Sequence, residues 1–424
     1  MRLVVLLLCA PGLLLAENWP GWRGPSGDGI SPEKGIPTTW SATENIAWKV
    51  AIPGNGHSSP VVWGNKVFVT TCLPEKEQRV LLCLDRRTGE TLWQTVVLTS
   101  LLETIHSLNS RASSTPATDG QRVFVTFMKA DNRKIPAPNV GTPRLITPGN
   151  LFAAAYDMAG KQKWKTVVGE FVSAHGFNTC PVLFEDLVIL NGDHDGNAYL
   201  VALDRVTGAE RWRIRRTNNT RSYVTPIIRG IGGRTQMILS GNMCIASYNP
   251  RNGKRHWIID GPTEQFVASM VYNGKYVFAT MGYPGRHVVA IRPEGRGNVT
   301  DTHIAWRTNR GAGYVPSPVV GGPYLLVVAD SGIASCFDAD TGKRHWMERL
   351  HGGHTASTVM ADGLVYCVSD SGVTTVIRLD ETFNVIARNE LGEKVTASAA
   401  ISQGQLFIRT HRHLYCIGAT KTGK

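Results

Sequence analysis

Ten polar and aromatic side chains of this sequence could together form a binding site. They are His57, His106, Asn109, Arg111, His175, Asn178, Arg221, Tyr223, Tyr314 and His354. Imidazole, amide, guanidinium and phenol groups donate or accept hydrogen bonds, so a converging set of them can hold a ligand by polar contacts. The set contains His and Arg but no carboxylate, and the sequence shows no nucleophile–base pair, so we assign no catalytic residue.

Motifs for catalysis or metal binding are also missing from the sequence. It contains no Walker loop, no H-E-x-x-H and no G-x-G-x-x-G that opens a helix. Asp193-x-Asp195-Gly196 resembles part of a calcium loop, but Asp330 and Asp370 begin Asp-Ser-Gly turns at the same hairpin position. A turn role explains all three segments, so we expect no metal site.

The cysteines give no disulfide framework. Removing Cys9, which lies in the apolar N-terminal run, leaves seven of the eight cysteines, and an odd number cannot pair completely. Cys83, Cys336 and Cys416 fall where a repeat described below places a small buried residue. We expect buried free thiols.

A repeat reveals the elements that must position the ten side chains. Asp204, Thr207, Gly208 and Trp212 form a frame that recurs four more times, with a shorter spacing or an Asn in two copies. The Asp carboxylate can accept backbone N–H bonds in a turn, and the Gly allows positive φ. The Trp then lies on the next strand, where it can pack between two sheets. The predicted docking tryptophans are Trp48, Trp93, Trp164, Trp212, Trp257, Trp306 and Trp346, with Arg388 at the eighth position.

Each docking strand belongs to a unit that contains a hairpin of two short apolar strands. Turns such as Gly64-Asn65 and Asp362-Gly363 join the strands of these hairpins. Eight hairpins begin at a small residue, namely Ser59, Thr115, Cys180, Thr225, Ser269, Ser317, Ser357 and Ser398. Most units are 40 to 49 residues apart, which is the period of a propeller blade. The sequence therefore predicts an all-β fold, an eight-bladed β-propeller of four-stranded blades.

The two ends of the chain are expected to share one blade. Trp48 precedes the first hairpin, whereas the chain after Ser398 has three strands and no Trp strand. An N-terminal strand around Trp48 would complete the blade formed by residues 397–417 and remove the free sheet edges. The propeller would then span residues 45–417, after an extended segment 17–44 and before a tail 418–424.

The ten side chains share one face of this predicted propeller. The loops that lead into each first strand, and those that join strands two and three, lie on the same side. Residues 94–112 and a Pro-rich insertion at 129–150 enlarge that side. Polar groups on long loops over a rigid scaffold commonly form binding sites, although they can also only line a wet channel.

Residues 1–16 predict a secretory signal peptide. Arg2 precedes an apolar run from Leu3 to Ala16, which is too short to span a bilayer. No other segment is long and apolar enough, so we expect an exported protein, periplasmic or extracellular, without a transmembrane segment. The formal net charge is +12, but the basic residues are spread along the chain. We therefore expect no nucleic-acid partner, and a monomer.

The unit from Ala202 to Trp212 resembles the tryptophan-docking repeat of propellers of the pyrroloquinoline-quinone (PQQ) type. The resemblance covers roughly residues 45–417 and includes propellers similar to the outer-membrane assembly protein BamB, which bind no quinone. The opening Asn18–Pro25, NWPGWRGP, is similar to that of exported PQQ-like repeat proteins. The resemblance implies either a binding propeller or a quinone enzyme.

Three functions follow from these observations. The first is a non-catalytic binding or scaffolding module with an envelope protein or polymer as partner, and with no cofactor. The second is an alcohol or sugar dehydrogenase that uses PQQ and calcium; against it stand the shorter chain, the absence of adjacent cysteines and the lack of a base. The third is a carbohydrate-binding propeller, for which Trp19 and Trp22 are candidate contacts. No pair of carboxylates suggests glycoside hydrolysis.

Overall fold

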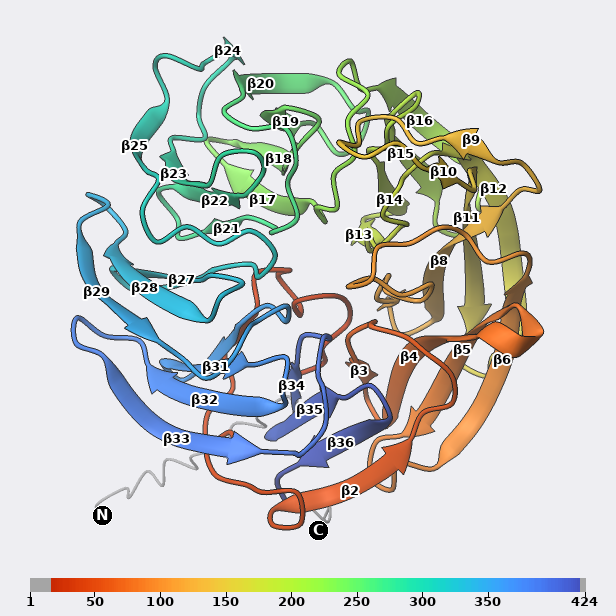
Figure 1. Ribbon diagram of the computed structural model, residues 1–424, viewed down its shortest axis with the longest axis horizontal. Helices are drawn as coiled ribbons and strands as arrows, with labels where there is room; N and C mark the ends of the chain where they lie inside the picture. Colours follow the sequence, from red (N-terminus) through yellow and green to blue (C-terminus); the bar gives the residue numbers. More distant parts are fainter. Residues whose placement is uncertain (1–16, 420–424) are drawn as a thin grey trace, which may run out of the picture.

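Eight antiparallel sheets surround a central axis in the computed structural model, which describes residues 17–419 (Figure 1). The predicted signal peptide 1–16 and the last residues of the predicted tail, 420–424, lie outside the described residues. Apart from one 3-10 turn at Pro74–Lys76, the secondary structure of the described part consists of strands. The predicted all-β, eight-bladed propeller is confirmed.

Blades 1, 3, 5 and 6 each contain four antiparallel strands. Blade 1 is β3 (Val61–Trp63), β4 (Lys66–Leu73), β5 (Gln78–Asp85) and β6 (Thr91–Thr99). Blade 3 is β13 (Val182–Phe184), β14 (Leu187–Gly192), β15 (Tyr199–Asp204) and β16 (Glu210–Arg215). Blade 5 is β21 (Val271–Tyr272), β22 (Val277–Met281), β23 (His287–Ile291) and β25 (Ile304–Thr308). Blade 6 is β26 (Val319–Gly321), β27 (Tyr324–Val328), β28 (Ile333–Asp338) and β29 (Arg344–Arg349).

Blades 2, 4 and 7 carry additions to this plan. Blade 2 is β7 (Ala117–Thr118), β8 (Arg122–Ala130), β11 (Gly149–Asp157) and β12 (Gln162–Phe171), with a small hairpin of β9 (Ile135–Pro136) and β10 (Leu145–Ile146) inserted. Blade 4 is β17 (Ile227–Ile231), β18 (Arg234–Gly241), β19 (Cys244–Tyr248) and β20 (Arg255–Asp260), extended by β24 (Gly297–Asn298). Blade 7 is β30 (Val359–Ala361), β31 (Leu364–Val368), β32 (Val373–Arg378) and β33 (Asn384–Glu390), extended by β1 (Ile30–Ser31).

Blade 8 joins the two ends of the chain. It consists of β34 (Ala400–Ser402), β35 (Gln405–Arg409), β36 (His413–Ile417) and the N-terminal strand β2 (Ile46–Ala51). β2 is antiparallel to β36, and Trp48 faces Cys416 in the register. The predicted closure of the ring by the N-terminal strand is therefore confirmed, because β2 covers the edge that β36 would otherwise expose.

Each of the seven predicted docking tryptophans bridges two blades. The indole N–H of Trp164 in blade 2, for example, donates to the carbonyl of Arg205 in the turn of blade 3, 3.1 Å away. The others donate in the same way to the carbonyls of Arg86, Met158, Pro250, Pro293, Ala339 and Asp380. A Cβ on Gly208 would lie 2.6 Å from the Trp164 ring, so glycine lets the indole approach the turn. The repeat thus fixes the packing between blades.

Trp40 occupies the junction that has no docking tryptophan. Arg388 is exposed, whereas Trp40 from the N-terminal segment is buried in the core cluster that blades 7 and 8 share. Its ring stacks on Tyr366, and its backbone N–H donates to Asn389 Oδ1 at 2.8 Å. The N-terminal segment therefore supplies the aromatic side chain that blade 7 lacks.

The N-terminal segment also crosses one end of the ring. Trp19 pairs with Val62 of blade 1, β1 pairs with β30 of blade 7, and Glu33 accepts backbone bonds from Gln403 and Gly404 of blade 8. In Figure 1 this segment runs as a red trace through the middle of the ring.

Buried polar contacts hold the centre of that segment in place. The side chain of Arg23 donates to the carbonyl oxygens of Asp28 and Pro318, and Asp28 pairs with Arg229 of blade 4 at 2.9 Å. The segment therefore contacts blades on opposite sides of the ring and obstructs the central channel at this end.

The two long loops are shorter than the sequence indicated. β6 extends to Thr99, so the first loop begins at residue 100 rather than 94. β8 and β11 reach Ala130 and Gly149, so the insertion is limited to residues 131–148. The strands continue because their pairing with β5 and with each other continues past the expected ends. The seven described cysteines are buried and unbonded to one another, as expected.

Candidate functional site

A cavity of about 290 Å³ lies on the propeller axis. Its upper walls come from the loops that lead into the first strands of the blades. Its lining residues are Trp22, His57, Ser59, His106, Leu108, Asn109, Ser113, Thr115, His175, Asn178, Cys180, Tyr223, Thr225, Val267, Tyr314, Val315, Asp330, Thr355, Ser357, Thr396 and Ser398. Because the members come from all eight blades and from the N-terminal segment, the closed ring is what assembles the cavity.

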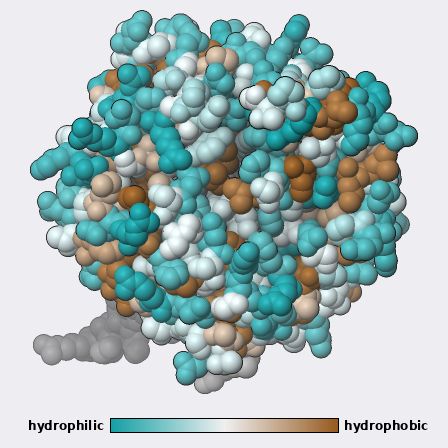
Figure 2. All heavy atoms as spheres, in the orientation of Figure 1, coloured by the Kyte–Doolittle hydropathy of each residue, from teal (hydrophilic) through white to brown (hydrophobic). Residues whose placement is uncertain are grey.

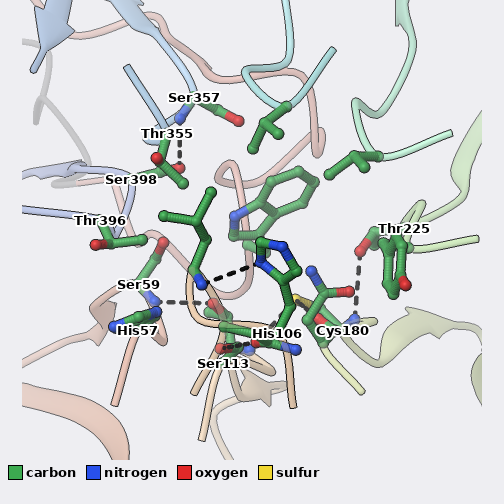
Figure 3. Close-up of a pocket in the computed structure, with 18 of the residues that line it drawn as sticks. His57, Ser59, His106, Ser113, Cys180, Thr225, Thr355, Ser357, Thr396 and Ser398 are labelled. Atoms are coloured by element: carbon green, nitrogen blue, oxygen red, sulfur yellow. Dashed lines mark hydrogen bonds between the residues drawn. The ribbon is translucent and has the colours of Figure 1, made fainter. Parts of the chain in front are cut away.

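The lower wall is a ring of hydrogen bonds that runs from blade to blade. The backbone N–H of each small residue at a hairpin start donates to the side chain of the equivalent residue in the next blade. Seven of these bonds are present, over distances of 2.9 to 3.3 Å, from Ser59 to Thr115 and onward to Ser398. Figure 3 shows two of them, Ser357 to Ser398 and Cys180 to Thr225, on opposite sides of the cavity. This explains why the seven positions from Thr115 to Ser398 are Ser, Thr or Cys.

Trp22 forms the floor. It lines the axial cavity and also a groove of about 570 Å³ between the N-terminal segment and blades 2 to 4. The indole therefore separates the two spaces, and the adjacent guanidinium of Arg23 lies 5.9 Å from its ring centre. Trp19, the other aromatic candidate, is fully buried against blade 1 and does not line the cavity.

A network of hydrogen bonds fixes the rim near blades 2 to 4. The hydroxyl of Tyr223 lies 2.8 Å from His175 Nδ1, and the two rings are stacked. The His106 ring packs edge-on against His175, and the Asn109 amide donates to the His175 carbonyl at 2.7 Å. Ser113 in turn donates to Asn109 Oδ1. These contacts fix the orientation of the rim side chains before any ligand arrives.

The buried imidazoles of the site are held neutral. Burial, together with the neighbouring His411 and Arg409, lowers the pKa of His57 to about 3. Burial, with Arg221 nearby, likewise lowers the pKa of His175 to about 3. An imidazole with such a pKa carries no charge near neutral pH, so both rings act as neutral hydrogen-bonding groups.

Seven of the ten predicted residues line this cavity: His57, His106, Asn109, His175, Asn178, Tyr223 and Tyr314. Arg111 lies outside it and lines a second cavity of about 210 Å³, which adjoins the first at His57 and Asn109. His354 is buried beside the axial cavity without lining it, and neither of its ring nitrogens has a hydrogen-bond partner among the described residues.

Arg221 holds the scaffold instead of facing the cavity. Its guanidinium pairs with Asp195 at 2.9 Å and donates to the carbonyl of Asn139, so it ties the insertion of blade 2 to blade 4. Asp193 forms a second buried pair with Arg216. Asp330 and Asp370 accept backbone N–H bonds from the loops before their hairpins. Their carboxylates thus tie the entry loop to the hairpin, whereas a turn role would pair them with N–H groups of their own turns. Asp193 and Asp195 differ, because arginine side chains satisfy their carboxylates.

Asp330, Thr355 and Thr396 also line the cavity, and the ring of small residues forms part of its wall, although no motif in the sequence indicated either. The sequence places a small residue at the same position of every blade, but this position predicted only the start of a strand. Six of the eight, Ser59, Thr115, Cys180, Thr225, Ser357 and Ser398, line the cavity. Their shared position in the repeat is the signal that could have placed them in a site.

The lining fits a quinone and calcium poorly. Asp330 is its only carboxylate, and both oxygens already accept backbone N–H bonds, from Tyr314 at 3.0 Å and Val315 at 3.2 Å. The lining has no Lys or Arg to meet the carboxylates of PQQ. Across residues 17–419, no group of three His, Cys, Asp or Glu side chains is arranged to hold a metal ion. Calcium, which takes several oxygen ligands, would lack them here.

The matching family model and the curated relative point to the same family. A family model described as outer membrane protein assembly factor BamB matches residues 37–135, 145–305 and 287–385. The BamB of Bordetella pertussis (strain Tohama I) is 26% identical over 211 residues, which are 46% of this chain and 51% of that protein. The match thus spans about half the length of this curated relative.

Solved structures share the fold at low identity. The BamB of Moraxella catarrhalis is 11% identical with a TM-score of 0.59, over 89% of this chain and 98% of that one. The quinohemoprotein alcohol dehydrogenase of Comamonas testosteroni is 11% identical with a TM-score of 0.66, over 96% and 82%. A europium-containing methanol dehydrogenase is 12% identical with a TM-score of 0.62, over 95% and 98%. These likenesses establish the propeller fold alone. No helix within residues 17–419 is long and apolar enough to cross a membrane.

Proposed function

Because this chain belongs to the family of outer membrane protein assembly factor BamB, we propose that it is an exported, non-catalytic propeller that binds a partner in the cell envelope. The partner contacts the face that carries the axial cavity. The matched family supports an envelope role, and the predicted signal peptide supports export. The lining of the cavity and the exposed side chains around it support the choice of binding face.

One observation carries the non-catalytic part of this proposal. Of the 21 residues that line the cavity, only Asp330 is a carboxylate, and backbone N–H groups occupy both of its oxygens. His57 and His175 have pKa values near 3, far from those of a general base that works at neutral pH. The site thus offers hydrogen-bonding groups for binding, and neither these two imidazoles nor the Asp330 carboxylate is suited to act as a general base.

Exposed apolar side chains on the same face fit a binding role. Leu108 is 61% exposed at the cavity rim, Leu145 is 63% exposed on the insertion of blade 2, and Tyr283 is 54% exposed on blade 5. In Figure 2 the hydrophobic residues form several small groups among hydrophilic ones. Small apolar groups within a polar surface are typical of non-obligate interfaces.

Site-specific cross-linking tests the position of the interface. A photo-reactive phenylalanine analogue at Leu108 should yield a discrete cross-linked product in living cells, and so should one at Leu145. Val206, which is 56% exposed in the turn between β15 and β16 at the other end of the blade, is the matched control and should yield none. Equal products at all three positions, or none at Leu108 and Leu145, would contradict the proposed face.

The dehydrogenase function deserves a direct assay because two of the similar structures are dehydrogenases. We expect no reduction of an electron-accepting dye when the purified protein receives PQQ, calcium and a panel of alcohols and aldoses. Turnover that disappears in an Asp330→Asn variant would refute the non-catalytic proposal and assign the base.

A further inference from the structure

We infer that the axial cavity binds one neutral sugar residue, whose ring packs against Trp22 and whose hydroxyl groups meet the Ser and Thr side chains of the wall. The inference deepens the proposed function and rests on it for the envelope location, because it names the chemistry of what the cavity face recognises.

The wall presents hydroxyl groups that are already oriented. Thr225, Ser357 and Ser398 line the cavity, and each side-chain oxygen accepts a backbone N–H from the preceding blade. Ser357 and Ser398 donate their hydroxyls to none of the described residues, so these two O–H groups remain available. An accepted hydrogen bond polarises a hydroxyl and makes it a better donor. A ligand with many oxygen acceptors arranged around a ring would satisfy this wall.

The floor and rim supply the apolar and aromatic contacts. Trp22 lines the bottom of the cavity, Val267 and Val315 add aliphatic surface, and Tyr314 contributes a phenol ring at the rim. Small-molecule sites are built in this way, with apolar and aromatic walls and a few placed polar groups. A sugar has the matching character, because the C–H groups of its ring form an apolar face and its edge carries hydroxyls.

The charge of the lining favours a neutral ligand. Lys and Arg are absent from it, and the only carboxylate is Asp330. The pKa values of His57 and His175 keep these rings uncharged. A carboxylated or phosphorylated ligand would lose its hydration here without gaining a cation as partner. This argument separates a neutral sugar from a uronic acid and from a quinone with several carboxylates.

The size of the cavity limits the ligand to a short unit. Its volume of about 290 Å³ is at the lower limit of ligand pockets, which span about 300 to 1,000 Å³. One sugar ring, or the end of a glycan, can therefore enter, whereas a longer segment of polymer must continue beyond the rim.

Titration calorimetry with defined sugars tests the inference. The mature protein should bind at least one of glucose, galactose and N-acetylglucosamine saturably, and glucuronate at least tenfold more weakly. Trp22→Ala should weaken binding at least tenfold, and Thr355→Val severalfold. Thr355 lines the cavity outside the ring of hydrogen bonds, so this variant should fold even if Trp22→Ala does not.

The matched control is Thr375→Val. Thr375 is a buried threonine of β32 whose hydroxyl has no hydrogen-bond partner among the described residues and does not line the cavity. This variant should bind as the parent does. The inference is overturned if none of the neutral sugars binds, if glucuronate or PQQ binds more tightly than every neutral sugar, or if both cavity variants bind as the control does. Cross-linking at Leu108 that persists without sugar binding would refute the sugar and leave the proposed function intact.

Discussion

Blade 3 contains a buried ion pair whose contribution to the stability of the fold can be measured. Arg216 Nε lies 2.9 Å from Asp193 Oδ1, and Nη2 lies 3.2 Å from Oδ2, so the contact is bidentate. The side chains are 3% and 0% exposed, and Arg216 also donates to the Tyr248 hydroxyl and to the Gly241 carbonyl. Asp193→Ala would leave a guanidinium buried without its counter-charge.

The expected cost follows from burial. Removing one partner of a buried pair destabilises a protein by about 3–5 kcal/mol. The same blade offers a control with the same residue types, because Arg211 and Asp186 lie 2.7 Å apart but are 46% and 57% exposed. An exposed pair contributes about 0–1 kcal/mol. Asp186→Ala should therefore have little effect, although its ion pair is the shorter of the two.

Urea unfolding at pH 7, followed by tryptophan fluorescence, would measure both variants against the parent. Asp193→Ala should lower the midpoint strongly, whereas Asp186→Ala should leave it nearly unchanged. Replacing both buried partners, with Asp193→Leu and Arg216→Met, should recover most of the loss because no unpaired charge remains. Equal destabilisation by the two alanine variants would refute the reasoning that burial decides the energy.

Three further predictions follow from the packing. Burial lowers the pKa of His354 to about 4 from 6.5, so between these values the unfolded chain binds a proton that the folded chain does not. The free energy of unfolding should therefore fall as pH is lowered through that window, by up to about 1.4 kcal/mol per pH unit for this group. Urea unfolding at several pH values should show that His354→Leu flattens the dependence of stability on pH. The same change at the exposed His351 should leave that dependence unaltered. Gly208→Ala should destabilise by more than about 1 kcal/mol, because its Cβ would meet Trp164, whereas Gly230→Ala, with open space around it, should be neutral in the same denaturation assay. Ellman's reagent should titrate almost no thiol in the native mature protein and seven after unfolding, because all seven described cysteines are buried; rapid native labelling would contradict the blade packing.

The repeat made most of the fold predictable. The Asp-Gly-Trp frame encodes a turn and a docking strand, and five copies at blade spacing leave few alternatives to a propeller. Trp48 precedes the first hairpin, whereas no Trp strand follows the last one, and this offset also predicted the closure of the ring. Strand ends were less predictable, as at Thr99 and Ala130, because pairing with a neighbouring strand decides where a strand stops.

The site was predictable only where the repeat places a residue. Many side chains just before a first strand line the axial cavity, among them seven of the ten named residues. Arg221 and His354 occupy similar positions but lie buried beside it, because an acidic partner and local loop packing draw them into the wall. The path of the N-terminal segment has no repeat behind it, so Trp22 at the floor could be named as a candidate but not placed.

The shared blade also constrains the order in which the molecule can be made. Ile46 and Ile417 are register partners, so a chain that emerges from its N-terminus carries an unpaired strand β2 until β36 has been synthesised. Contacts between such distant residues form late and slowly. Until then, the edge of β2 remains open to other strands. A truncation before His413 should therefore remove β36 and leave β2 without its pairing partner. The ring should then stay open.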